Sequence, residues 1–509
     1  MKLHIVVSKA VTKEEWEKVY DETAEIVQRL SMAEVRNVQV RGISVECLVP
    51  VKERYSMEKG KTEKKWRTSG DYKELYTGED FSLSESMMDE STECDVSDAL
   101  YGMIKERQVC RNQYVSILWG KKIYEESYFI KLLALACLIQ TSLKEKVFIF
   151  GDMTIGQCRQ AVRLINAYSD KPVEIPDIFE QQRLMSRIQN EPFQEVEKMR
   201  IFARMYQGEK GDEFGTYLRE SFSGQVCREF WKREFAGETA GTYTFDIALY
   251  NYLSWGFDLN SLYDVIDQEC NHERTAFETL IRSILETEIY KKEKKVMNTL
   301  EFDEDMQRIH SLEIQRIRFV IDSFQRNKVD RYIPLDEIRE SLKNGLGRKW
   351  QIDTDSIIDQ YLKEEKRKKN AHEEWEGKRG KEESYDISLY HQLLNYKCGN
   401  SIKPVIRQSL RNFFRFYRER LQEKEFADLI GQPPEEKCKW MVENNKGVLL
   451  RDQDWGKIFA DIEYEKCSFA RYYPLMRVKL DHPCILDMAR GIVLNDELYR
   501  YCMDMADPV

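Results

Sequence analysis

Residues 74–98 form a run of nine carboxylates without a lysine or arginine, in a chain of 509 residues whose formal net charge is −10. Without this run the chain is nearly neutral. Blocks of like charge repel one another and resist burial, so the run predicts a solvated loop or a surface that meets a basic partner. The nine acids are Glu74, Glu79, Asp80, Glu85, Asp89, Glu90, Glu93, Asp95 and Asp98.

The same run contains large apolar residues, among them Phe81 and Leu83, that can anchor it on a surface. Two functional interpretations therefore stand beside the solvated loop. The run either covers a basic surface of the same chain, or it mimics phosphate groups and occupies a basic site on a partner. The acids assigned to such a contact are Glu85, Asp89, Glu90, Glu93 and Asp95.

A second segment has the opposite charge. Between Lys403 and Arg420 there are six basic residues and one acid. Four of the arginines are spaced four, four and three apart, which places them along one face of a helix beside an apolar stripe. Guanidinium groups bind phosphate and carboxylate in a planar, bidentate manner, so this face predicts a docking surface, and the alternative is an ordinary solvated face. The four residues are Arg407, Arg411, Arg415 and Arg418.

The pattern of apolar residues predicts an N-terminal α+β or α/β domain over residues 1–176. Short apolar strands at 3–7, 115–119 and 147–150 occur among amphipathic helices. Two alternating runs between 38 and 49 flank Arg41-Gly42, a pattern typical of a hairpin or a bulged strand.

Helix starts and one core helix are also predicted in this region. Thr12 with Glu15, and Thr154 with Gln157, have the spacing of capping boxes. The apolar stretch at 129–139 is interrupted by Lys131 and is shorter than the roughly 20 residues that span a bilayer, which predicts a buried helix and no membrane contact.

The rest of the chain is predicted to be mainly helical. We expect a helical domain at 177–362, a charged linker at 363–384 and a helical C-terminal domain at 385–509. The linker contains eight lysines and arginines and seven glutamates, and Trp375 is its only large apolar residue. Such a segment buries too little apolar surface to form a core, so it predicts a solvated helix or a mobile connector.

Motifs for catalysis, nucleotides or metals are weak. Gly151 and Gly156 have P-loop spacing, but Gln157 and Cys158 stand where lysine and a hydroxyl residue are needed. The pairs Cys270/His272 and His482/Cys484 each supply half of a structural zinc site. Twelve cysteines occur without a CxxC pair, which is typical of a reducing compartment. We therefore expect no metal, no cofactor and a cytoplasmic location.

These observations predict a non-enzymatic binding or regulatory protein that acts through charged protein–protein contacts, as an inhibitor or immunity protein does. Two alternatives stay open. One is a nucleic-acid-binding protein that uses the arginine-rich helix at 403–420, although nucleic-acid-binding domains usually carry a basic excess. The other is an enzyme whose site is assembled from residues far apart in the sequence.

Overall fold

The computed structural model describes residues 1–58, 61–86, 94–109, 113–123, 126–292, 328–347, 352–376, 384–445, 447–464, 468–477 and 482–506. The chain forms two compact units. The first contains Met1–Pro176 and Glu382–Val509, together with 302–311, which lie outside the described residues. The second contains Asp177–Glu301 and Leu312–Lys381. The four-part division drawn from the sequence stays a prediction.

The first sheet has three antiparallel-paired strands in the order β7-β1-β8. The central strand β1 (Lys2–Ser8) lies between β7 (Val115–Lys122) and β8 (Val147–Gly151). Helices α2 (Ala99–Val109) and α3 (Glu126–Leu143) pack against this sheet, and α4 (Ile155–Asn166) packs against α3.

The second sheet contains the β2–β3 hairpin, one of the two arrangements predicted from the sequence. Its strands pair in the order β3-β2-β5-β4, and β6 pairs with β5. Arg41 and Gly42 form the hairpin turn, both with positive φ (49° and 83°). All pairs are antiparallel, so the N-terminal region is α+β, one of the two predicted classes. The strands are β2 (Met32–Val40), β3 (Ile43–Pro50), β4 (Arg54–Glu58), β5 (Lys61–Asp71) and β6 (Tyr76–Ser84).

Helices α1 (Lys13–Arg29) and α4 begin with the predicted capping boxes, at Thr12 and Thr154 respectively.

Helix α3 is the predicted core helix. The stretch Glu126–Lys146 is long and apolar enough to cross a membrane by length and composition, yet 72% of its most apolar window is buried inside the protein. Burial against the sheets and α1 accounts for its apolar sequence.

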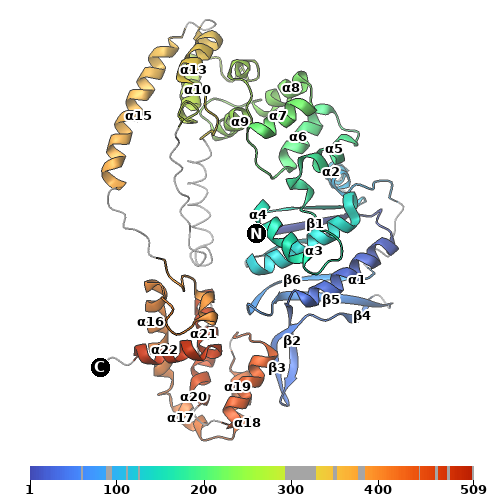
Figure 1. Ribbon diagram of the computed structural model, residues 1–509, viewed down its shortest axis with the longest axis vertical. Helices are drawn as coiled ribbons and strands as arrows, with labels where there is room; N and C mark the ends of the chain where they lie inside the picture. The colour runs from blue at the N-terminus through green and yellow to red at the C-terminus, as the bar shows by residue number, and fades with distance from the viewer. Residues whose placement is uncertain are drawn as a thin grey trace. The chain divides into compact units, whose positions relative to one another are not determined.

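The C-terminal helices of the first unit pack on the β2–β3 hairpin. Val45, Cys47 and Val49 of β3 share one hydrophobic core with these helices, and the backbone N–H of Leu48 donates to the Leu450 carbonyl at 2.9 Å. The helices are α16 (Pro404–Arg420), α17 (Lys424–Ile430), α18 (Pro434–Glu443), α19 (Asp452–Tyr464), α20 (Ser468–Tyr472), α21 (Pro483–Leu494) and α22 (Asp496–Ala506) (Figure 1).

The second unit is helical with an aromatic core. Trp231 contacts Phe230, Tyr252 and Trp255 with ring centroids 5.0 to 5.1 Å apart. The α-helices of this unit that the structure describes are α5 (Gln181–Gln189), α6 (Glu195–Met205), α7 (Asp212–Ser221), α8 (Gly224–Glu234), α9 (Tyr243–Ser254), α10 (Arg274–Glu286), α13 (Leu335–Leu342) and α15 (Thr354–Glu376).

The first part of the predicted linker is helical, because α15 extends to Glu376. Its glutamates contact α10 and the segment after it. Glu364 pairs with Arg282 at 2.9 Å, and Glu365 accepts from the Tyr290 hydroxyl at 2.5 Å. These contacts fix the start of the predicted linker on the second unit, and 377–383 lie outside the described residues.

Candidate functional site

Part of the acidic run forms a strand, and carboxylates on and beside this strand contact bases. Residues 76–84 form β6, paired with β5. Glu79 lies 3.6 Å from Lys121, Glu85 lies 3.6 Å from Lys64, and Asp80 pairs with Arg67. The predicted solvated loop is therefore wrong for 76–84, because bases on adjoining strands face these acids.

The remaining acids of the run differ in their settings. The side chain of Asp98 accepts from the backbone N–H of Tyr101 at 3.0 Å and so caps the start of α2. Asp95 is exposed. Desolvation acts to lower the pKa of Lys105, but the Tyr114 hydrogen bond outweighs it with a small contribution from the Asp95 charge, so this pKa is raised. Asp89, Glu90 and Glu93 lie outside the described residues.

The four predicted arginines lie on the exposed face of α16, which we call the arginine face: Arg407, Arg411, Arg415 and Arg418. Within the described residues, Arg407, Arg411 and Arg415 form no ion pair. The opposite side of α16 is buried through Ile406, Leu410, Phe413, Phe414 and Tyr417. Because this apolar side is held in the core, the arginines are presented by a fixed helix.

Helix α22 borders the arginine face. Burial raises the pKa of the Tyr501 hydroxyl, while the nearby charges of Arg407 and Arg411 act in the opposite direction. The Tyr501 ring contacts Tyr396 at a centroid distance of 5.3 Å. On the same helix Met503 is 41% exposed. The arginine face therefore adjoins an aromatic ring, and an exposed methionine lies on the same neighbouring helix.

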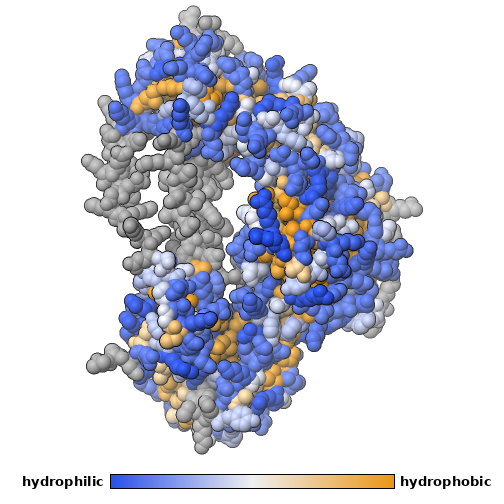
Figure 2. Space-filling model, in the orientation of Figure 1, coloured by the Kyte–Doolittle hydropathy of each residue, from blue (hydrophilic) through white to orange (hydrophobic). Residues whose placement is uncertain are grey.

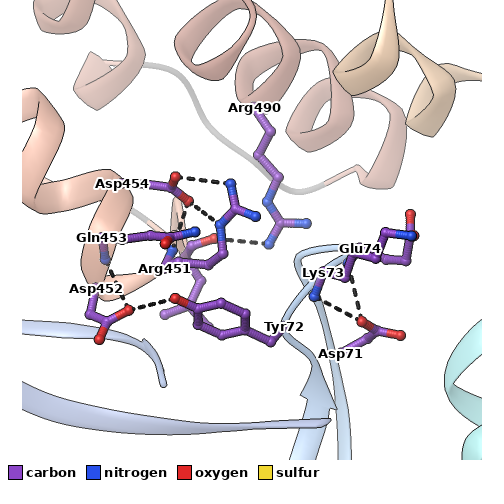
Figure 3. Close-up of polar contacts among 10 residues, drawn as sticks. Asp71, Tyr72, Lys73, Glu74, Arg451, Asp452, Gln453, Asp454 and Arg490 are labelled. Atoms are coloured by element: carbon purple, nitrogen blue, oxygen red, sulfur yellow. Dashed lines mark hydrogen bonds and ion pairs between the residues drawn. The ribbon is translucent and has the colours of Figure 1, made fainter. Parts of the chain in front are cut away.

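A buried arginine lies at the junction of the β5–β6 turn with α19 and α21 (Figure 3). Arg490 is 4% exposed, and its Nη2 donates to the Leu449 carbonyl at 3.1 Å, but its buried Nε has no hydrogen-bond partner. No ion pair to Arg490 is present within the part of the chain that the structure describes. Burial lowers the pKa of Arg490 to about 10, against the opposing charge of Asp487, so the guanidinium stays charged at neutral pH.

Arg451, two residues after the Leu449 carbonyl that accepts from Arg490, is held by its own acid. Its Nε and Nη2 donate to the two carboxylate oxygens of Asp454 at 2.6 and 2.9 Å (Figure 3). The guanidinium carbon lies 5.8 Å from the centre of the Tyr72 ring, and the Tyr72 hydroxyl donates to Asp452 at 2.8 Å. This network connects the β5–β6 turn to the start of α19.

The turn itself is fixed by a buried carboxylate. Asp71 is fully buried and accepts from the backbone N–H groups of Lys73 and Glu74 at 2.9 and 3.1 Å (Figure 3). Its other oxygen lies 2.5 Å from Lys131 Nζ and accepts from Ser127. The lysine that interrupts the apolar helix in the sequence is thus the counter-ion of Asp71.

The weak sequence motifs have structural roles. Gly151 has φ +151°, and a Cβ there would lie 2.0 Å from the Lys2 carbonyl, so the glycine permits close pairing with β1. His272 Nδ1 lies 2.6 Å from the Glu269 carbonyl oxygen, and His482 caps the start of α21. Among the described residues no three histidine, cysteine, aspartate or glutamate side chains are grouped to hold a metal ion.

Comparisons with protein-family models, with curated proteins and with solved structures give no match.

Sequence reasoning missed the junction at Arg490. Its residues come from 71–74, 449–454 and 490, which no local pattern connects. One signal was present: Arg490, like Lys131, is a single base within an apolar helical stretch. Such a base is expected to be buried, and it then requires a partner.

Proposed function

We propose that the protein is a non-enzymatic binding protein whose arginine face docks an acidic segment of a protein partner. The observation that supports this proposal is the row of exposed arginines on a helix whose other side is buried. Arg407, Arg411 and Arg415 keep their donors available, whereas the described acids of β6 already contact bases. The proposal therefore rests on the arginine face rather than on the acidic run.

A protein partner fits this surface better than nucleic acid does. Arginine, tyrosine and methionine are enriched at protein–protein interfaces, and Tyr501 and Met503 accompany the arginines on the neighbouring helix. Exposed acids also lie on these two helices, namely Glu419 and Asp504. A surface that binds the phosphate backbone of nucleic acid is expected to lack such acids.

The setting proposed for this contact is the cytoplasm. Ten cysteines of the described residues are free thiols, and seven of them are buried. Buried thiols without disulfides suit a reducing compartment. The side of the protein drawn in Figure 2 is mostly hydrophilic with limited hydrophobic patches, as expected from a chain in which 33% of residues are charged.

The proposal is tested with a fluorescent peptide that has the sequence of residues 84–98 with Cys94→Ser, used as an acidic probe with apolar anchors. Binding to the full chain is measured by anisotropy. We expect the peptide to bind more tightly than its version with all acids changed to Asn or Gln. The double variant Arg411→Glu/Arg415→Glu should weaken binding at least tenfold, about 1.4 kcal/mol, because two attractions become repulsions.

The matched control is Arg159→Glu/Arg163→Glu. These arginines are exposed on α4, have the same four-residue spacing and give the same change in net charge. If both double variants weaken binding equally, the effect is one of net charge and the docking proposal is wrong. If a 20-base-pair DNA duplex binds the arginine face more tightly than the peptide, with a steep salt dependence, the nucleic-acid alternative replaces it.

A further inference from the structure

Residues 234–273 of the second unit form a further acidic stretch, and the structure describes every one of them. They contain eight acids but no lysine or arginine, in a chain that has 79 of these bases. Glu269 is exposed, Glu238 and Asp267 are partly exposed, and none of the three forms an ion pair within the described residues. In this they differ from the acids of β6, which contact bases of neighbouring strands.

These three acids lie together on a fixed surface, which we call the acidic surface. Burial raises the pKa of the Cys270 thiol, and the charges of Asp267, Glu269 and Glu238 raise it further, so the three carboxylates surround this residue. Asp267 accepts from the backbone N–H of the residue before Glu238 at 2.8 Å, and the buried Asn271 side chain donates to the Glu238 carbonyl at 2.8 Å. Because hydrogen bonds join the two segments, docking on them requires little ordering of the backbone.

An exposed aromatic ring borders the acidic surface. Tyr243 is 48% exposed, and the hydroxyls of Thr242 and Thr244 on either side of it donate to the Glu238 carboxylate. Arginine pairs with carboxylates and also stacks on aromatic rings. The acidic surface is therefore complementary to the arginine face of α16, whose exposed guanidinium groups form no ion pair at Arg407, Arg411 and Arg415.

We propose that the acidic partner of the arginine face is a second copy of this chain, which docks through its acidic surface. The proposal rests on the function proposed above and names its partner. The contact brings the unpaired arginines of one copy to the unpaired acids of the next, and such charge complementarity selects the partner and fixes the register. Two different surfaces meet, so the contact is heterologous, and pairs of copies extend to rings or longer chains as the concentration rises.

The test is sedimentation equilibrium of the full chain over a range of concentrations, with two charge-reversal variants. We expect the weight-average mass of the wild type to rise with concentration. Arg411→Glu/Arg415→Glu and Glu238→Lys/Glu269→Lys should each weaken self-association at least tenfold, because each places like charges opposite one another. An equimolar mixture of the two variants should associate again, because the intact arginine face of one meets the intact acidic surface of the other.

Matched controls change the net charge equally. Arg159→Glu/Arg163→Glu on α4 and Glu213→Lys/Glu220→Lys on α7 alter exposed residues and should associate as the wild type does. If the lysine variant of the acidic surface does not fold, Glu238→Gln/Glu269→Gln takes its place. It keeps an acceptor for the threonine hydroxyls and removes the charge, so it should also weaken self-association.

Three results would overturn the proposal: a wild type that stays monomeric, face variants that associate as their controls do, or a mixture that stays monomeric. The peptide of residues 84–98 separates this failure from failure of the proposed function. A monomeric chain that binds the peptide through Arg411 and Arg415 keeps the docking function, with a different protein as its partner. A monomeric chain that does not bind the peptide loses both.

Discussion

Arg187 in the second unit and Arg490 in the first are both buried, but their surroundings differ. Arg187 is 8% exposed and lies 2.7 Å from Asp177, which also accepts from Arg183 at 3.0 Å. Among the described residues, Arg490 donates to the Leu449 carbonyl, and its Nε has no hydrogen-bond partner. The first arrangement pairs the buried arginine with an acid, whereas the second has no ion pair among the described residues. Unpaired charge, rather than charge alone, is therefore what marks a candidate site in this protein.

Removing Arg187 should have the largest effect. In Arg187→Met the buried Asp177 loses one of its two cations, and breaking a buried pair from one side typically costs 3 to 5 kcal/mol. Because Arg183 remains, we expect a loss of about 3 kcal/mol in the local opening free energy. Amide hydrogen exchange in α5 and α6, measured on the full chain, should accelerate about 100-fold.

The comparison for that experiment is an exposed pair on the same unit. Arg233 and Glu229 are 46% and 47% exposed in their side chains and lie one helical turn apart. Arg233→Met should change the local opening free energy, measured by the same amide exchange, by less than about 0.5 kcal/mol. If Arg187→Met behaves like Arg233→Met, the paired arrangement contributes nothing to stability and the contrast with Arg490 loses its meaning.

Lys131→Met should have a smaller effect, because its acid has further partners. Asp71 keeps the two backbone N–H groups and Ser127 after the lysine is removed. We expect a loss of about 2 kcal/mol in the free energy of unfolding, measured by urea titration of the full chain. A double-mutant cycle with Asp71→Asn isolates the pair. Strictly additive losses would show that Lys131 acts through its packing and not through Asp71.

The features predicted correctly from the sequence are those that depend on residues close together in the chain. Thr12 and Thr154 cap their helices, Arg41-Gly42 closes a hairpin, and the buried stripe of α16 follows its 3.6-residue period. These features need neighbours within a few residues, and one sequence contains that information.

Features that depend on distant partners were missed. Strand β5 buries Glu63, Thr68 and Asp71, so it lacks the alternating apolar residues that identify a strand. The acidic β6 was expected to be a loop because Arg67, Lys64 and Lys121, which pair with its acids and with Glu85, come from other strands. The arginine face was found because it lies on one helix, whereas the Arg490 junction requires three separate segments to meet.

The smallest expected effect tests the contrast between paired and unpaired arginines at Arg471. This arginine also contacts α21, but unlike Arg490 it is paired with an acid. It donates to the Ile492 and Val493 carbonyls at the end of α21 and to Asp496 at 2.6 Å. The hydrogen bond from Arg471 lowers the pKa of Asp496, against the opposing effect of its partial burial. An acid with a lowered pKa in the folded state stabilises the protein above its unfolded-state pKa of about 3.9, and this stabilisation is lost as the pH falls through the lowered value.

Asp496→Asn should therefore be less stable than the wild type at neutral pH, and the two should converge at a pH below the lowered pKa. Because the Asp496 side chain is half exposed, solvent screening limits the difference to about 0.5 kcal/mol. Urea titrations at pH 7, at about pH 4 and at a still lower pH measure it. Asp504→Asn, exposed on the same helix, is the control and should show no difference. A difference that stays constant down to the lowest pH would mean that Asp496 acts through shape rather than charge, and that its ion pair with Arg471 contributes nothing to stability.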